Sequence, residues 1–263
     1  MLPLYQIDAF AERPFTGNPA AVVVSPEPLA PETMQAIAEE NNLAETAFVV
    51  PRGDGDFDLR WFTPTLEVDL CGHATLAAAH ALLLRGDAAG VVRFHSASGL
   101  LTVTEEAGRL VLDFPEVPVL GPFTDNGVGA ALGVEAELWE VTQVHGARYV
   151  LARVASEAEV IACAPDIGAL HALDTNVIVT AEGTAHDVVS RFFAPGSGVD
   201  EDPVTGSAHC TLGPFWAERL GQTRLRCRQL SQRGGNVGVE VAGGRVRLSG
   251  SAVLYLEGRI RVG

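Results

Sequence analysis

Arg60-Trp61-Phe62-Thr63-Pro64 recurs about half a chain later as Arg191-Phe192-Phe193-Ala194-Pro195. A Val-Asp pair follows each copy at the same distance, and a Gly-x-Ala triplet then begins an apolar helix. Three short segments typical of strands follow each helix. The same units in the same order indicate an internal duplication, because self-similarity at a fixed spacing is the mark of a repeat. The sequence therefore predicts two related α/β halves.

The two triplets are Gly72-His73-Ala74 and Gly206-Ser207-Ala208. The first amides of a helix have no intrahelical partner and lie at the positive end of the helix dipole. We expect the two helix N-termini to face one cleft and to bind an anionic substrate from two sides. The competing interpretation is an ordinary capped helix, because Ser and Thr are common at helix starts.

The segment 114–123 contains three prolines, a density that suits a linker. We place the boundary there, with an N-terminal half over 1–118 and a C-terminal half over 119–263. Short strands joined by tight turns predict largely antiparallel sheets with a few helices. The last three strands are expected near 225–230, 237–241 and 246–248.

Composition narrows the class of protein. The chain has 263 residues, 47% of them hydrophobic, and a net charge of −15, which disfavours nucleic acid as a partner. No apolar stretch reaches the roughly 18 residues of a membrane helix. The N-terminus lacks the features of a signal peptide. The sequence thus predicts a cytoplasmic protein that binds neither nucleic acid nor a membrane, and four free cysteines without a C-x-x-C pair.

Three side chains are candidates for chemistry. Glu45 is a lone acid between a helix and an apolar strand, where partial burial would make it a proton donor and acceptor. His73 can change charge near neutral pH. Asp202 precedes the second helix and could reach a cationic or hydroxyl group of a ligand. The competing interpretations are a solvated strand-end glutamate, a histidine bonded to a backbone carbonyl, and a capped helix.

A metal site is not predicted. Cys71 and His73 have no nearby third ligand in the chain, and His209-Cys210 is not a standard ligand spacing. No phosphate loop, dinucleotide fingerprint or nucleophile elbow is present. No cofactor is therefore expected.

Four motifs together resemble the PhzF family of phenazine-biosynthesis isomerases, and they span nearly the whole chain in order. They are Ile7-Asp8-Ala9-Phe10 with Pro14-Phe15-Thr16-Gly17-Asn18-Pro19-Ala20, then Ala44-Glu45-Thr46-Ala47-Phe48, Cys71-Gly72-His73-Ala74-Thr75, and Glu201-Asp202-Pro203-Val204-Thr205-Gly206-Ser207-Ala208. The resemblance implies the α+β fold of diaminopimelate epimerase, with two pseudo-symmetric domains. In each domain a curved, mostly antiparallel sheet wraps around a central helix.

The resemblance also implies a cofactor-free site between the domains of a homodimer. Glu45 would be the general acid and base. The other implied site residues bind or position the substrate: His73, Asp202 and Ser207 by side chains, Gly72 and Gly206 by backbone donors, and Asn18 from the first motif. The best-known activity of the family moves a proton between ring carbons of a dihydro-hydroxyanthranilate.

Two departures from the family leave the substrate open. Ala44 replaces a hydroxyl residue, and Ser231-Gln232-Arg233-Gly234-Gly235 replaces a glutamine-glycine segment. The leading hypothesis is a cofactor-independent isomerase or epimerase that shifts a proton on a small carboxylate-bearing metabolite. One alternative is a thiol-assisted amino-acid racemase using Cys71, although Pro203 stands where a second thiol would be. The other is a non-catalytic protein that binds small acids.

Overall fold

The computed structural model describes residues 1–144 and 146–262. The chain divides into two compact units, Met1–Asp113 with Ser249–Gly263 as unit 1, and Phe114–Leu248 as unit 2. The sequence places the division between 118 and 119 and assigns the C-terminal residues to the second half. They belong to unit 1 because β18 (Ala252–Ile260) pairs with β1 (Leu2–Ala9), from Leu2↔Ile260 to Ala9↔Ala252.

Unit 1 is built on one curved sheet in which the hydrogen-bonded order is β18–β1–β2–β3–β4–β6–β7–β8. Its further elements are β2 (Asn18–Val24), α1 (Pro31–Asn41), β3 (Glu45–Pro51), β4 (Phe57–Phe62), β5 (Glu67–Val68), α2 (Gly72–Arg85), β6 (Val91–Ser96), β7 (Gly99–Glu106) and β8 (Arg109–Pro115).

Unit 2 follows the same plan, with the hydrogen-bonded order β9–β10–β11–β12–β13–β15–β16. Its elements are β9 (Val119–Pro122), α3 (Val128–Leu132), β10 (Glu137–Val144), β11 (Ala147–Arg153), α4 (Glu157–Ala162), α5 (Ile167–Ala172), β12 (Asn176–Glu182), β13 (Val188–Ala194), the 3₁₀ helix η1 (Pro195–Ser197), β14 (Val199–Asp202), α6 (Gly206–Leu220), β15 (Arg224–Gln229), β16 (Gly235–Ala242) and β17 (Arg245–Gly250).

The strand pairings from β18 to β7 in unit 1 correspond in order to those from β9 to β16 in unit 2. Parallel pairs join β2 to β3 and β4 to β6 in unit 1, and β11 to β12 and β13 to β15 in unit 2. The register also agrees, because Phe48↔Arg60 in unit 1 matches Val179↔Arg191 in unit 2. The predicted fold class, two pseudo-symmetric α+β domains with mostly antiparallel sheets, is confirmed.

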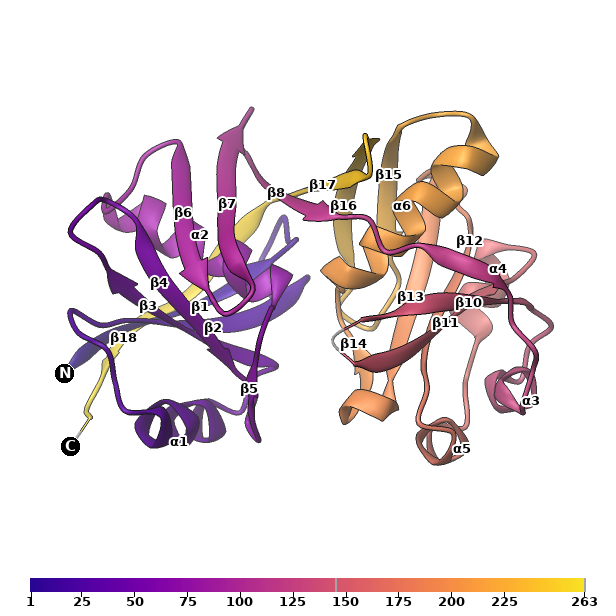
Figure 1. Cartoon of the computed structure of the whole chain (residues 1–263), viewed down its shortest axis with the longest axis horizontal. Helices are drawn as coiled ribbons and strands as arrows, with labels where there is room; N and C mark the ends of the chain where they lie inside the picture. The colour runs from indigo at the N-terminus through magenta and orange to yellow at the C-terminus, as the bar shows by residue number, and fades with distance from the viewer. Residues whose placement is uncertain (145, 263) are drawn as a thin grey trace. The chain divides into compact units, whose positions relative to one another are not determined.

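In unit 1 the central helix is α2, which is rich in alanine and leucine and ends at Gly86 in the left-handed conformation. Nine of its fourteen residues are buried. Figure 1 shows α2 inside the curved sheet and α1 outside it. Because helices cover both faces, β2 is an almost continuous apolar strand with little alternation.

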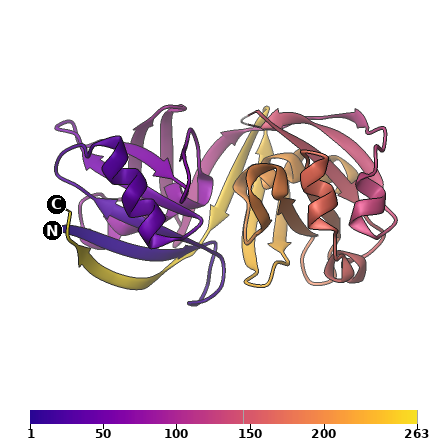
Figure 2. The ribbon, with the colours of Figure 1, turned by 90° about the horizontal axis from the view of Figure 1, so that it is seen from below.

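In unit 2 the central helix is α6, and α4 and α5 cover the outer face of the sheet (Figure 2). The outer layer buries Val160 of α4 and Leu170 of α5 against strands β11, β12 and β13. Among the described residues, no helix has both the length and the apolar character needed to cross a membrane.

Candidate active site

The site residues of unit 1 come together at the N-terminus of α2. Strands β2 and β3 run in parallel with Ala20 beside Glu45, so that Asn18 and Glu45 lie near the starts of neighbouring strands. His73 is in the first turn of α2 and reaches both of them. Its Nε2 lies 3.0 Å from Glu45 Oε2, and its Nδ1 lies 3.2 Å from Asn18 Nδ2. The Cys71 sulfur lies 3.4 Å from the same Nδ1.

These groups are withdrawn from solvent. His73 is 6% exposed, and the Glu45 side chain is 19% exposed. Although Glu45 Oε2 and His73 Nε2 are close, they are not aligned, and neither has a hydrogen-bond partner among the described residues. Buried polar atoms are nearly always bonded, so this pair of atoms is suited to receive a ligand or a proton.

The environment shifts the proton affinities of the cluster. Burial raises the pKa of the Cys71 thiol, which therefore stays protonated at neutral pH. Burial opposes charge on His73, but Cys71 and, after it, the Glu45 carboxylate outweigh the effect of burial and raise the pKa of the ring well above its usual value. The charge on this histidine is thus set by its immediate neighbours.

Glu45, Cys71 and His73 each place one possible ligand atom within 4.8 Å of the others. The thiol, however, contacts Nδ1 of the ring, whereas the carboxylate lies beside Nε2. A metal ion takes one nitrogen of a histidine, and its ligands converge on one point. Since the two neighbours lie at opposite edges of the ring, the geometry fits a chain of polar contacts better than a metal site.

The site residues of unit 2 lie at the equivalent N-terminus, that of α6. Thr205 is the residue before the helix, and its hydroxyl donates to the Asp202 carboxylate. The buried carboxamide of Gln229 fixes both sides of this loop. Its oxygen accepts from the Thr205 amide at 2.9 Å, and its nitrogen donates to the Asp202 carbonyl at 2.7 Å.

Two more contacts hold the same loop. Ser231 Oγ donates to the Pro203 carbonyl at 2.7 Å, and Tyr149 Oη lies 3.4 Å from Ser207 Oγ. Burial raises the pKa of Tyr149, which keeps its hydroxyl neutral. The α6 loop is therefore fixed mainly by neutral hydrogen bonds. Sequence analysis missed Gln229 and Tyr149, because neither lies in a motif and their role arises from strand pairing.

Both central helices begin without a side-chain cap. No cap bond forms at Cys71 or Thr205, whereas Ser156 and Asp166 accept first-turn amides at the starts of α4 and α5. Uncapped helix N-termini attract anions, because their amides and dipole point outward. Gly72 and Gly206, the first residues of α2 and α6, lie in the predicted position for such donors.

The predicted site residues thus fall into two groups. In unit 1, the structure brings Glu45, His73 and Asn18 together beside Gly72. In unit 2, it places Asp202 next to the first turn of α6, which contains Gly206 and Ser207. Asn18 is fully buried against His73, so its direct neighbour is the ring.

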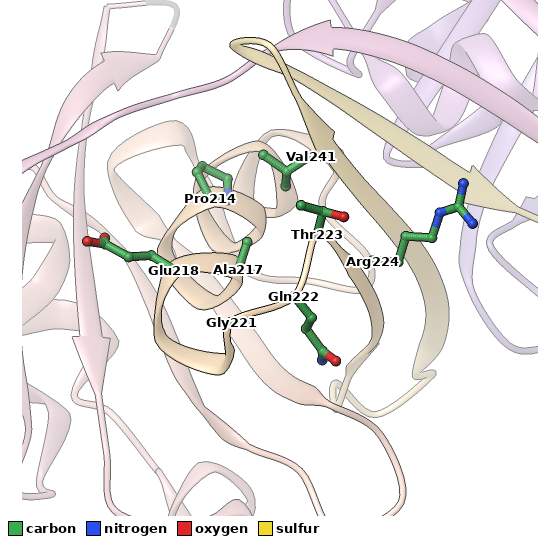
Figure 3. Close-up of a pocket in the computed structure, with 8 residues that line it drawn as sticks. All are labelled: Pro214, Ala217, Glu218, Gly221, Gln222, Thr223, Arg224 and Val241. Atoms are coloured by element: carbon green, nitrogen blue, oxygen red, sulfur yellow. The ribbon is translucent and has the colours of Figure 1, made fainter.

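Two cavities of the described residues lie elsewhere. A cavity of about 710 Å³ surrounds the C-terminal end of α6, where Figure 3 shows Gly221 and Gln222, far along the helix from Gly206. A cavity of about 420 Å³ in unit 1 is lined by Arg52, Asp56, Arg85 and their neighbours. Neither is lined by a predicted site residue.

Comparison with known proteins gives consistent matches. The PhzC-PhzF model of phenazine biosynthesis-like proteins matches residues 7–258. Two proteins of Pseudomonas aeruginosa named as uncharacterised isomerases are 50% and 49% identical, each over 99% of both chains. The crystal structure of a PhzF-family phenazine biosynthesis protein from Enterococcus faecalis superimposes with a TM-score of 0.93, at 44% identity and over 99% of both chains.

Proposed function

Because this chain belongs to the family of phenazine biosynthesis-like proteins and its close relatives are isomerases, we propose that it shifts a proton on a small carboxylate-bearing metabolite without a cofactor. Glu45 is the general acid and base. The observation that carries the proposal is the pair of buried atoms, Glu45 Oε2 and His73 Nε2, which lie 3.0 Å apart without an aligned partner.

Glu45 takes a proton from one carbon of the substrate and returns a proton to another. Such positioned acid–base catalysis contributes about 10²–10⁴-fold to a rate. The amides at the uncapped start of each central helix, near Gly72 in unit 1 and near Gly206 in unit 2, are donors suited to a substrate carboxylate. These local donors offset the net charge of −15, which otherwise repels an acid.

His73 in unit 1, and Asp202 and Ser207 in unit 2, are the residues that we propose position polar groups of the substrate. Gln229 supports this by fixing the backbone on either side of Pro203-Val204, so that Asp202 and α6 keep a constant spacing. Ala44 supplies no hydroxyl, and we propose a substrate other than the dihydro-hydroxyanthranilate of phenazine synthesis. We also propose a homodimer, which sedimentation velocity tests directly.

The test is deuterium incorporation in heavy water, read by mass spectrometry over a panel of small carboxylic acids. Wild type, Glu45→Gln and the matched control Glu67→Gln are compared. Glu67 is exposed and paired with Arg60, so its replacement changes the charge equally. We expect exchange into one compound with the wild type and the control, and loss of exchange with Glu45→Gln.

Two outcomes contradict the proposal. Exchange that survives Glu45→Gln but is lost after alkylation of Cys71 supports the thiol-assisted racemase, which the contact between Cys71 and His73 would serve. Tight binding of an acid without any exchange supports the binding protein. Asp202→Asn separates binding from chemistry, since a positioning role raises KM more than it lowers kcat.

A further inference from the structure

Strand β18 lies at one edge of the sheet of unit 1. It pairs with β1 from Leu2↔Ile260 to Ala9↔Ala252, and Figure 2 shows it, in yellow, on the outer side of β1. Among the residues that the structure describes, no second strand of unit 1 packs along it. Within unit 1, the far side of β18 therefore presents backbone donors and acceptors to which another strand can add.

This strand carries two opposite charges, two residues apart. Glu257 and Arg259 are both exposed, and their side chains share one face because side chains alternate along a strand. Neither forms an ion pair with a described residue, and Arg259 donates to the Met1 carbonyl at 3.4 Å. Charges on an edge strand commonly keep other chains away. Two opposite charges can also select a partner whose charges are arranged to match them.

The other face of β18 is apolar. Ile260 packs against the buried cluster between α1 and the sheet, and Leu256 lies on the same face, two pairs further along the strand. Leu256 is exposed, and so are Tyr255 and Phe15, whose ring centroids lie 5.5 Å apart in an edge-to-face contact. Exposed apolar side chains gathered in one place are typical of a protein interface.

An antiparallel pair of two β18 strands matches both faces at once. With Gly258 of each copy at the two-fold axis, Glu257 lies opposite Arg259 of the partner subunit, and Leu256 lies opposite Ile260 of the partner subunit. A shift of two residues would place two glutamates or two arginines opposite each other. A shift of one residue would place each charge opposite glycine or beyond it. Of these registers, one alone combines charge and apolar complementarity.

We propose that β18 is the surface through which two copies of this chain associate, as an antiparallel strand pair centred on Gly258. The inference rests on the homodimer of the proposed function, and it names the surface that forms this homodimer. The same residues supply both sides, as the two-fold symmetry of a dimer requires. The sheet of unit 1 then continues into the second copy, and neither β18 is left as an open edge.

Charge reversal tests the pairing, by sedimentation velocity of the full chain over a series of concentrations. Arg259→Glu places like charges opposite each other, and it should raise the dissociation constant of the dimer by about 10-fold or more. Glu257→Arg should have the same effect. The double variant restores opposite charges and should dimerise as the wild type does. Arg93→Glu is the matched control, because Arg93 is exposed on β6, an interior strand.

A disulfide tests the register. Residues opposite each other in an antiparallel pair have Cα atoms about 4.5–5.5 Å apart, which a disulfide can span. A Cβ at Gly258 would meet the Leu256 side chain at 3.7 Å, an ordinary contact, so Gly258→Cys should fold. We expect it to form a covalent dimer under mild oxidation, since the four natural cysteines are buried. Gly53→Cys, in an exposed turn with open space around it, is the control.

The outcomes separate the surface from the rest of the proposed function. A dimer that both single charge reversals leave intact, a double variant that stays dissociated, or a Gly258→Cys that cross-links no faster than Gly53→Cys overturns the proposal and leaves the homodimer in place. A wild type that is monomeric at every concentration overturns both. Deuterium exchange tests the proton shift independently. Should a charge variant not fold, the cross-link decides.

Discussion

The starts of α2 and α6 have the same architecture and different chemistry. Each helix follows a pair of antiparallel strands and begins with glycine. The side chain of its fourth residue is within hydrogen-bond distance of the backbone carbonyl of the residue before the helix. Thr75 Oγ1 donates to the Cys71 carbonyl at 2.6 Å, and His209 Nδ1 lies 2.7 Å from the Thr205 carbonyl. The duplicated backbone thus keeps even this local contact.

The side chains around the two starts have diverged. Glu45 begins β3, whereas Asn176 begins β12 at the equivalent register. His73 corresponds to Ser207. The first site thus combines a carboxylate with an imidazole, whereas the second combines the Asp202 carboxylate with hydroxyl groups. Under the proposed function, one copy of the repeated unit is the proton-transfer half and the other is the binding half, so that function would lie in the side chains rather than in the fold.

The strongest test of this comparison is to remove the acidic side chain from unit 1 and to place one at the equivalent position of unit 2. Glu45→Gln should reduce the exchange rate by about 10²–10⁴-fold, because the general acid and base is lost. Asn176→Asp places an acid at the equivalent position of unit 2, where a serine stands instead of the imidazole. We expect the double variant to remain inactive in the deuterium assay. Recovered exchange would contradict the division of roles.

The next largest effect is expected on the free energy of unfolding, when the ion pairs of the repeated arginines Arg60 and Arg191 are broken. Arg191 and Glu201 form a pair with side chains 16% and 23% exposed, and Arg191 Nη1 also donates to the Cys163 carbonyl at 2.5 Å. Arg60 and Glu67 form the same pair at 40% and 39% exposure. Removing one partner of a largely buried pair costs about 3 kcal/mol, against less than about 1 kcal/mol at the surface.

Urea unfolding of Glu201→Gln and Glu67→Gln measures the difference. The first should lose about 3 kcal/mol of unfolding free energy and the second less than about 1 kcal/mol. Equal losses would show that the two arginines support their units equally. Because neither glutamate belongs to the proton-transfer cluster, deuterium exchange by the folded variants should be unchanged.

A smaller, pH-dependent effect should come from His209. Burial holds its pKa at about 4, below the usual value of 6.5, so the folded ring stays neutral while the unfolded ring gains a proton. Above pH 6.5 the buried neutral ring of His209 does not lower the free energy of unfolding. As the pH falls from 6.5 to about 4, the unfolding free energy decreases, because only the unfolded ring gains a proton. The loss is about 3 kcal/mol, since each pKa unit is worth about 1.36 kcal/mol.

His209→Thr imports the residue that unit 1 has at this position, Thr75. The unfolding free energies of wild type and variant, measured by urea titration between pH 4 and 7, should differ by an amount that grows as the pH rises. A constant difference would mean that His209 does not titrate across this range. The comparison removes the contribution of the carboxylates common to both proteins.

The capped outer helices should give the smallest effect. Ser156 accepts the Glu159 amide at 3.3 Å at the start of α4, a bond that the central helices lack. Ser156→Ala should cost about 1 kcal/mol of unfolding free energy without altering exchange. Ser156→Thr is the matched control, because it keeps the oxygen. A change in exchange would link the outer layer to the reaction.

Local signals predicted much of the fold. The sequence places a break at Pro165 in a helical segment, and α4 and α5 lie on either side of it. It predicts the helix Pro31–Asn41 with the bounds that α1 has. The repeated Arg60 and Arg191 motifs predict the duplication, which the shared registers confirm. These features depend on proline, capping and periodicity, which act within a few residues.

Long-range features were not predicted. No strand was expected over 252–260, where β18 forms, because Glu257, Gly258 and Arg259 interrupt its apolar pattern. The strand forms because it pairs with β1, from which it is separated by nearly the whole length of the chain. Gln229 was missed for the same reason. For the candidate site, motifs supplied Glu45 and His73, but the contact of Asn18 with the ring depends on the parallel pairing of β2 with β3.

Because Leu2 pairs with Ile260, unit 1 can be completed only after the last strand has been synthesised at the ribosome. Unit 1 is started first and finished last, since all of unit 2 is synthesised between its two pieces. During that interval β1 lacks its neighbour β18, and an unpaired edge is prone to join another chain. Unit 2 is continuous and can fold as soon as it emerges. The half proposed to bind substrate is thus completed before the half proposed to move the proton.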